Sequence, residues 1–108
     1  MGTLSTHILD TSRGRPAPGV TITLEDAAGS VVGQGVTDAD GRVGTIGPEV
    51  LEAGDYRLRF AAKAYFDGLG VESFYPEVVV VFTIADPAQH YHVPVLLNPF
   101  GYSTYRGS

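Results

Sequence analysis

The stretch that decides the fold is HYHVPVLLNPFGYSTYRGS, residues 90–108, which predicts a strand, a turn and a second strand. Side chains alternate between the two faces of a strand, and one face of the first strand is apolar or aromatic: Tyr91, Val93, Val95 and Leu97. We expect this face to pack against a core. The other face begins with two imidazoles, His90 and His92. Beyond the turn signal Asn98-Pro99, a hairpin directs the hydroxyls of Ser103 and Tyr105 toward that imidazole face.

The rest of the chain predicts an all-β protein. Its 14 glycines and 7 prolines divide it into short extended segments in which apolar and polar residues alternate. The predicted strands before the hairpin cover residues 4–10, 20–24, 31–37, 42–45, 56–60 and 78–84. Residues 12–19 contain prolines and glycines that predict a loop, and residues 61–70 hold the only helical candidate.

One predicted strand, residues 78–84, is apolar on both faces. Such a strand is either buried between layers or covered by another subunit. Seven or eight strands with one short helix are arranged most economically as a two-sheet β-sandwich. The length of 108 residues fits one domain, which we expect to span residues 1–108.

The composition indicates an ordinary globular protein, since 44% of the residues are hydrophobic and 18% are charged. A net charge of −5 without a Lys/Arg cluster argues against a nucleic-acid partner. The chain has no cysteine, so it offers neither a disulfide nor a thiolate nucleophile. No apolar run approaches the roughly 18–20 residues that span a bilayer. No secretory signal pattern is present either, so we expect a cytoplasmic protein without a membrane partner.

Three side chains stand out as candidates for chemistry: His7, Arg42 and His92. His7 shares a predicted strand face with Ser5 and Leu9, so it is not a solvated loop residue. An arginine after an Asp-Gly turn, as Arg42 is, usually carries a surface charge. A single histidine is usually structural or partly exposed. Three histidines on predicted strands, two of them on one face, favour a functional patch.

Two rival sites would use the same residues. His90 and His92, together with His7, could offer three imidazoles to a zinc ion, although His-x-His spacing often arises by chance. Ser103 could belong to a Ser-His-Asp triad, but the chain has no Gly-x-Ser-x-Gly elbow. Phosphate-binding glycine patterns are also absent from the sequence. Residue patterns alone therefore predict a β-sandwich with an imidazole-rich patch.

Several motifs resemble the transthyretin-related family, and specifically its enzymatic branch, the 5-hydroxyisourate hydrolases. They are Thr6-His7-Ile8-Leu9-Asp10, Asp40-Gly41-Arg42, His90-Tyr91-His92-Val93-Pro94 and Leu96-Leu97-Asn98-Pro99-Phe100-Gly101. The ending Tyr102-Ser103-Thr104-Tyr105-Arg106-Gly107-Ser108 resembles the signature that separates this branch from the hormone carrier transthyretin. The resemblance runs from Leu4 to Ser108.

The resemblance implies a transthyretin-like sandwich assembled as a homotetramer, a dimer of dimers around an open channel. Each active site would lie at the dimer–dimer interface on that channel. The catalytic set falls on His7, Arg42 and His92, and these residues would also bind the substrate. The resemblance adds further substrate-binding residues near the C-terminus: Ser103, Tyr105, Arg106, Gly107 and Ser108. It implies that neither a cofactor nor a metal takes part.

The implied reaction is the hydrolysis of 5-hydroxyisourate, the product of urate oxidase, to 2-oxo-4-hydroxy-4-carboxy-5-ureidoimidazoline. Water attacks a ring amide, and histidine suits this task because its ordinary pKa of about 6.5 lets it accept and return a proton near neutral pH. Two other interpretations stay open. One is a non-catalytic carrier of small aromatic ligands, and the other is a sandwich module with a structural or adhesive role.

Overall fold

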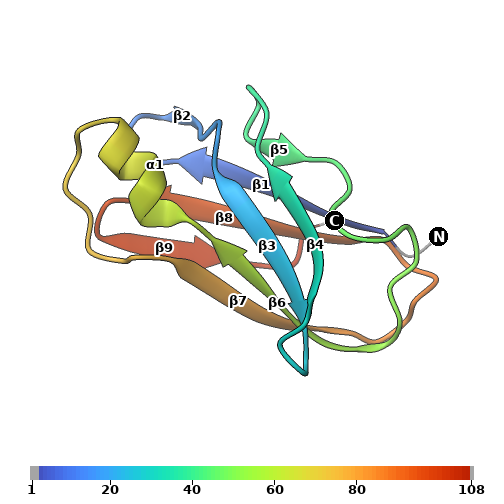
Figure 1. The fold of residues 1–108 in the computed structure, drawn as a ribbon. Coiled ribbons are helices and arrows are strands. Elements are labelled where there is room, and N and C mark those ends of the chain that lie inside the picture. Colours follow the sequence, from blue (N-terminus) through green and yellow to red (C-terminus); the bar gives the residue numbers. More distant parts are fainter. Residues whose placement is uncertain (1–2, 108) are drawn as a thin grey trace.

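The computed structural model describes residues 3–107 and contains two β-sheets packed face to face, with one short helix (Figure 1). One sheet has the strand order β4-β3-β6-β7. The other has the order β2-β1-β8-β9, with β5 also paired to β1. The elements are β1 (Leu4–Asp10), β2 (Arg15–Pro16), β3 (Thr21–Asp26), β4 (Val31–Val36), β5 (Arg42–Val43), β6 (Gly54–Phe60), α1 (Ala62–Gly68), β7 (Val78–Ile84), β8 (Tyr91–Asn98) and β9 (Gly101–Thr104).

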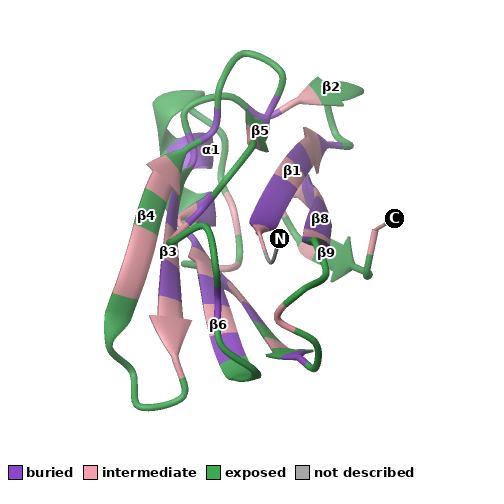
Figure 2. Cartoon of the chain, turned by 90° about the vertical axis from the view of Figure 1, so that its right-hand side faces the viewer, coloured by how far each residue is buried: buried purple, intermediate pink, exposed green. Residues whose placement is uncertain are grey.

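The core lies between the two sheets. Each sheet contributes the apolar face that strand alternation predicts, so the buried segments of β1, β3, β6 and β8 face one another (Figure 2). On β8, the predicted inward set is buried: Tyr91, Val93, Val95 and Leu97. The largest fully buried side chains include Phe60 and Phe66. The predicted all-β, two-sheet sandwich with one short helix is therefore confirmed.

The predicted loop over residues 12–19 is wrong in one detail. Arg15 and Pro16 form a two-residue strand, β2, which pairs with Asp10 and Leu9 of β1. Proline is tolerated there because β2 is an edge strand, where the missing N–H does not interrupt a ladder. With β2 included, residues 3–107 contain nine strands, and β5 is shorter than predicted, at two residues.

The edge strand β7 buries only one of its two apolar faces. Val78, Val80 and Ile84 point into the core, whereas the side chain of Val81 is 67% exposed. The prediction that this strand is buried between two layers is therefore wrong for the single chain. Its coverage by another subunit stays a prediction.

The helix α1 closes the end of the sandwich at which β1 ends (Figure 1). Its Phe66 is buried in the core, and the Tyr65 hydroxyl donates a hydrogen bond of 2.8 Å to the carboxylate of buried Asp10. That carboxylate also accepts hydrogen bonds from the backbone N–H and the hydroxyl of Ser12. No helix in the described part of the chain is long and apolar enough to cross a membrane.

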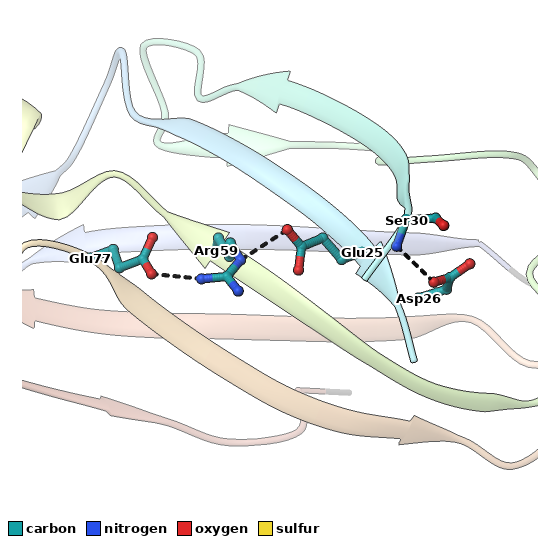
Figure 3. A network of polar contacts seen from close by, with 5 residues as sticks. All are labelled: Glu25, Asp26, Ser30, Arg59 and Glu77. Carbon is teal, nitrogen blue, oxygen red and sulfur yellow. Dashed lines mark hydrogen bonds and ion pairs between the residues drawn. The ribbon is translucent and has the colours of Figure 1, made fainter. Parts of the chain in front are cut away.

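Ion pairs connect strands of the β4-β3-β6-β7 sheet. Arg59 of β6 pairs with Glu25 of β3 at 3.0 Å and with Glu77, just before β7, at 2.6 Å (Figure 3). Asp26 at the end of β3 accepts a hydrogen bond from the backbone N–H of Ser30 (Figure 3). These partly exposed contacts stabilise the sheet that does not carry the imidazoles.

Candidate active site

The candidate site lies on the outward face of the other sheet, where β5, β1 and β8 run side by side (Figure 1). His7 of β1 pairs with Arg42 of β5 and with Pro94 of β8. Ser5, two residues earlier on β1, pairs with His92. Because alternate residues share a face, His7, Arg42 and His92 project from the same side of the sheet, in two adjacent rows.

A tight turn delivers Arg42 to this face. The side chain of Asp38 accepts hydrogen bonds from the backbone N–H groups of Asp40, at 2.9 Å, and Arg42, at 3.0 Å. Gly41 has a φ of 72°, and a Cβ at this position would lie 2.4 Å from the carbonyl oxygen of Ile8. Only glycine fits both the backbone conformation and this close approach. The turn therefore positions the Arg42 backbone before any ligand binds.

The imidazole of His92 is held by a hydroxyl from the neighbouring strand. Ser5 Oγ lies 2.8 Å from Nδ1 of His92 and 2.9 Å from Nε2 of His90. The other nitrogen of His90, Nδ1, contacts the hydroxyl of Thr3. Ser5 is 8% exposed, so its hydroxyl is buried between the two rings.

A pocket of about 280 Å³ opens beside these groups. It is lined by Ser5, Thr6, Arg42, Val43, Gly44, His90 and His92. His7 lies in the next row and does not line the pocket, although it is close enough to act on His92 electrostatically. The single chain thus brings Arg42 and His92 to one pocket and leaves His7 at its margin.

The environment of His92 lowers its pKa below the ordinary value of 6.5. Burial is the largest cause, because it disfavours the charged ring, and the positive charges of Arg42, His7 and His90 act in the same direction. A hydrogen bond to the backbone of Ser5 acts against the decrease. Near neutral pH the ring is therefore neutral and available as a proton acceptor.

The chain end reaches this site through Gly107. Its backbone N–H donates a hydrogen bond of 2.8 Å to the carbonyl oxygen of His92. A Cβ at Gly107 would lie 2.5 Å from Cδ2 of His92, so the backbone passes directly against the imidazole. Ser108, which the resemblance also assigns to the site, lies outside the described residues.

Two of the remaining predicted tail residues, Tyr105 and Arg106, do not line the pocket of Arg42 but line a second pocket, of about 320 Å³, that His92 also lines. The guanidinium carbon of Arg106 lies 4.5 Å from the ring centroid of Tyr91. Tyr105 is 58% exposed. Ser103 pairs with Leu96, four residues along β8 from His92, which corresponds to about 13 Å at the usual rise of a strand.

The geometry argues against both rival sites. Because Ser103 is about 13 Å from His92 along the strand, it is too far away to pass a proton to that imidazole within one chain. Within residues 3–107, no three histidine or acidic side chains are arranged so that they could hold a metal ion. Between His90 and His92 stands the hydroxyl of Ser5.

Among the residues of this pocket that the sequence-based prediction did not assign to the site, Ser5 and His90 are the two that are joined to His92 by hydrogen bonds, Ser5 directly and His90 through Ser5. Alternation already placed Ser5 on the face of His7, and His90 on the face of His92. The missing information was the parallel pairing of β1 with β8, which sets Ser5 beside His92. Such a pairing joins strands more than eighty residues apart, and no local pattern encodes its register.

Comparisons with known proteins agree with this fold. The model of the HIUase/Transthyretin family matches residues 4–107. The sequence is 48% identical over 109 residues to the 5-hydroxyisourate hydrolase of Salmonella dublin, covering 97% of this chain and 80% of that protein. The structure matches Klebsiella pneumoniae 5-hydroxyisourate hydrolase with a TM-score of 0.91 and 44% identity, over 98% of this chain and 99% of the other. It matches sea bream transthyretin in complex with thyroxine with a TM-score of 0.88 and 36% identity, over 97% and 94% of the two chains. The chain therefore belongs to the HIUase/transthyretin family.

Proposed function

We propose that this chain hydrolyses 5-hydroxyisourate to 2-oxo-4-hydroxy-4-carboxy-5-ureidoimidazoline, a step of urate degradation in purine metabolism. The observation that carries the proposal is the pocket in which a neutral, partly buried His92 lies beside the guanidinium of Arg42. The relatives named 5-hydroxyisourate hydrolase support the choice of substrate, since they match nearly the whole chain.

His92 is the group that we assign as the general base. Its lowered pKa keeps the ring neutral near pH 7, so it can take a proton from water as the water oxygen attacks the ring amide carbonyl. The amide C–N bond then breaks, and the leaving nitrogen takes up a proton. His7, in the next row of the same face, is suited to orient the water or to supply that proton.

Arg42 is suited to hold the substrate and to stabilise the charge that develops on it. Its planar guanidinium offers several N–H donors, which match the carbonyl groups and the deprotonated edge of a purine-like ring. The same positive charge would stabilise the oxyanion formed when water attacks. Its backbone is already positioned by the turn at Asp38, so the substrate needs to order only the side chain.

We further propose that the active form is a homotetramer, a dimer of dimers. The single chain leaves apolar and aromatic side chains exposed on β7 and near the chain end, namely Val81, Phe100, Tyr102 and Tyr105. Ser103 lies about 13 Å along β8 from His92 of its own chain, and association could bring its hydroxyl toward the substrate of a neighbouring copy. Tyr105 and Arg106 line the second pocket at His92 of their own chain. Light scattering after size-exclusion chromatography tests this assembly.

The activity itself is tested by mixing the protein with freshly generated 5-hydroxyisourate and following the ultraviolet absorbance. We expect the decay to be faster than the spontaneous reaction and to be insensitive to a chelator. Decay at the spontaneous rate with binding of aromatic ligands would instead support a non-catalytic carrier. The cytoplasm stays the proposed location, which cell fractionation tests.

A further inference from the structure

The hydroxyl of Ser5 connects two imidazoles, yet it carries only one proton. It lies within hydrogen-bond distance of Nδ1 of His92 and Nε2 of His90. It can therefore donate to one ring nitrogen while it accepts from the other. Two arrangements of the protons satisfy both contacts, and they differ in which nitrogen of His92 carries the hydrogen.

In the first arrangement, His92 donates from Nδ1 to Ser5, and Ser5 donates to Nε2 of His90. His90 then carries its hydrogen on Nδ1 and donates it to the hydroxyl of Thr3. In this state Nε2 of His92 holds a lone pair, and within residues 3–107 it has no hydrogen-bond partner. In the second arrangement the direction is reversed, so Nε2 of a neutral His92 carries a hydrogen and cannot accept a proton.

We propose that Ser5 and His90 are positioning residues that hold His92 in the tautomer with its proton on Nδ1, which leaves Nε2 free as the base. The proposal rests on the proposed function of His92. Of the two arrangements that the three contacts permit, only the one in which His92 donates to Ser5, Ser5 to His90 and His90 to Thr3 leaves Nε2 of a neutral His92 able to accept a proton. The buried position of Ser5 limits the access of water to its own two contacts, whereas the contact between Thr3 and His90 is exposed.

Nitrogen-15 NMR of labelled histidine tests the tautomer directly, because a protonated and an unprotonated ring nitrogen have different chemical shifts. In the unaltered protein we expect the proton of His92 on Nδ1. In Ser5→Ala we expect a mixture of tautomers and a kcat lower by about tenfold, the effect of one ordinary hydrogen bond, with KM unchanged. Ser5→Thr keeps the hydroxyl and should restore both properties.

Thr11→Ala is the matched control, since it removes a hydroxyl whose one hydrogen bond within the described residues is to the backbone carbonyl of Leu97. Its tautomer and kcat should equal those of the unaltered protein. An unchanged His92 spectrum and an unchanged kcat in Ser5→Ala would overturn the proposal. If the unaltered protein does not hydrolyse 5-hydroxyisourate, the proposed function fails, whereas the NMR result still decides whether Ser5 sets the tautomer.

His90→Gln tests the chain of contacts from its other end. A glutamine amide can either donate to Ser5 or accept from it, so it does not fix the direction of the contacts, and we expect a mixture of His92 tautomers as in Ser5→Ala. A His92 spectrum equal to that of the unaltered protein would overturn the role assigned to His90.

Discussion

Replacing Gly107 by alanine is expected to disturb the site through a single carbon atom. The added Cβ would lie 2.5 Å from Cδ2 and 3.3 Å from Cγ of the His92 ring. Non-bonded carbon atoms ordinarily lie about 3.5–4.0 Å apart, so either the ring or the chain end has to move by about 1 Å. Both are held in place, the ring by Ser5 at 2.8 Å and the chain end by its hydrogen bond of 2.8 Å to the His92 carbonyl.

A displacement of about 1 Å at a reacting group lowers a rate on the order of 10²-fold, and we expect kcat of Gly107→Ala to fall by this amount. The assay is the initial rate of absorbance loss with freshly generated 5-hydroxyisourate. Gly68→Ala is the control, because it adds the same methyl group in helix α1, where nothing in residues 3–107 outside the adjacent residues and the helix's own backbone lies within 4 Å. That variant should keep its activity and gain up to about 1 kcal/mol of stability, since alanine favours helix.

The thermal unfolding of each variant has to be measured together with its rate, so that loss of folded protein is not taken for loss of catalysis. We expect Gly107→Ala to melt close to the unaltered protein, because position 107 is joined to the sheet by a single isolated bridge. A folded Gly107→Ala variant with undiminished kcat would contradict this prediction, since it would show that the site tolerates the movement of the His92 ring or of the backbone at position 107.

The remaining predictions concern the base, the pH dependence and the end of the sandwich. His92→Asn keeps hydrogen bonding but removes the base, so kcat should fall on the order of 10²–10⁴-fold; an unchanged kcat would remove His92 from the mechanism. Because the pKa of His92 is lowered from 6.5, the acidic limb of kcat should lie below pH 6.5, and a limb at or above pH 6.5 would contradict this assignment. The folded chain binds fewer protons at His92 than the unfolded chain just below that pH, so the free energy of unfolding should decrease as the pH falls through this range. Tyr65→Phe removes a donor to the buried Asp10 carboxylate and should lower the free energy of unfolding in urea by about 1–3 kcal/mol without changing kcat.

Local patterns were sufficient to predict most of the strands. The strands at residues 4–10 and 78–84 have the predicted bounds, because turn residues flank runs that are dense in apolar side chains. Arg42 directly follows its turn as predicted, since the Asp-Gly dipeptide encodes the positive φ of Gly41. Alternation also identified the buried face of β8. These features depend only on residues that are neighbours in the chain.

Features that depend on distant pairing could not be predicted in the same way. Ser5 meets His92 only because β1 and β8 pair in parallel with one particular register. After β9, Arg106 packs on the ring of Tyr91 and Gly107 bridges to His92, two contacts that alternation along the strand does not encode. No sequence pattern predicts the proposed contribution of side chains from neighbouring copies to the site, because that contribution depends on how folded chains associate.

The most direct test of the central claim compares the unaltered chain with Arg42→Met in the 5-hydroxyisourate absorbance assay. The substitution keeps a long side chain at the pocket but removes the guanidinium that we propose to bind the substrate and to stabilise the oxyanion. We expect the unaltered chain to accelerate the decay far beyond the spontaneous rate and the variant to lose most of that acceleration. Decay at the spontaneous rate with the unaltered chain would show that this chain does not hydrolyse 5-hydroxyisourate. Equal acceleration by both proteins would show that Arg42 has no part in the reaction.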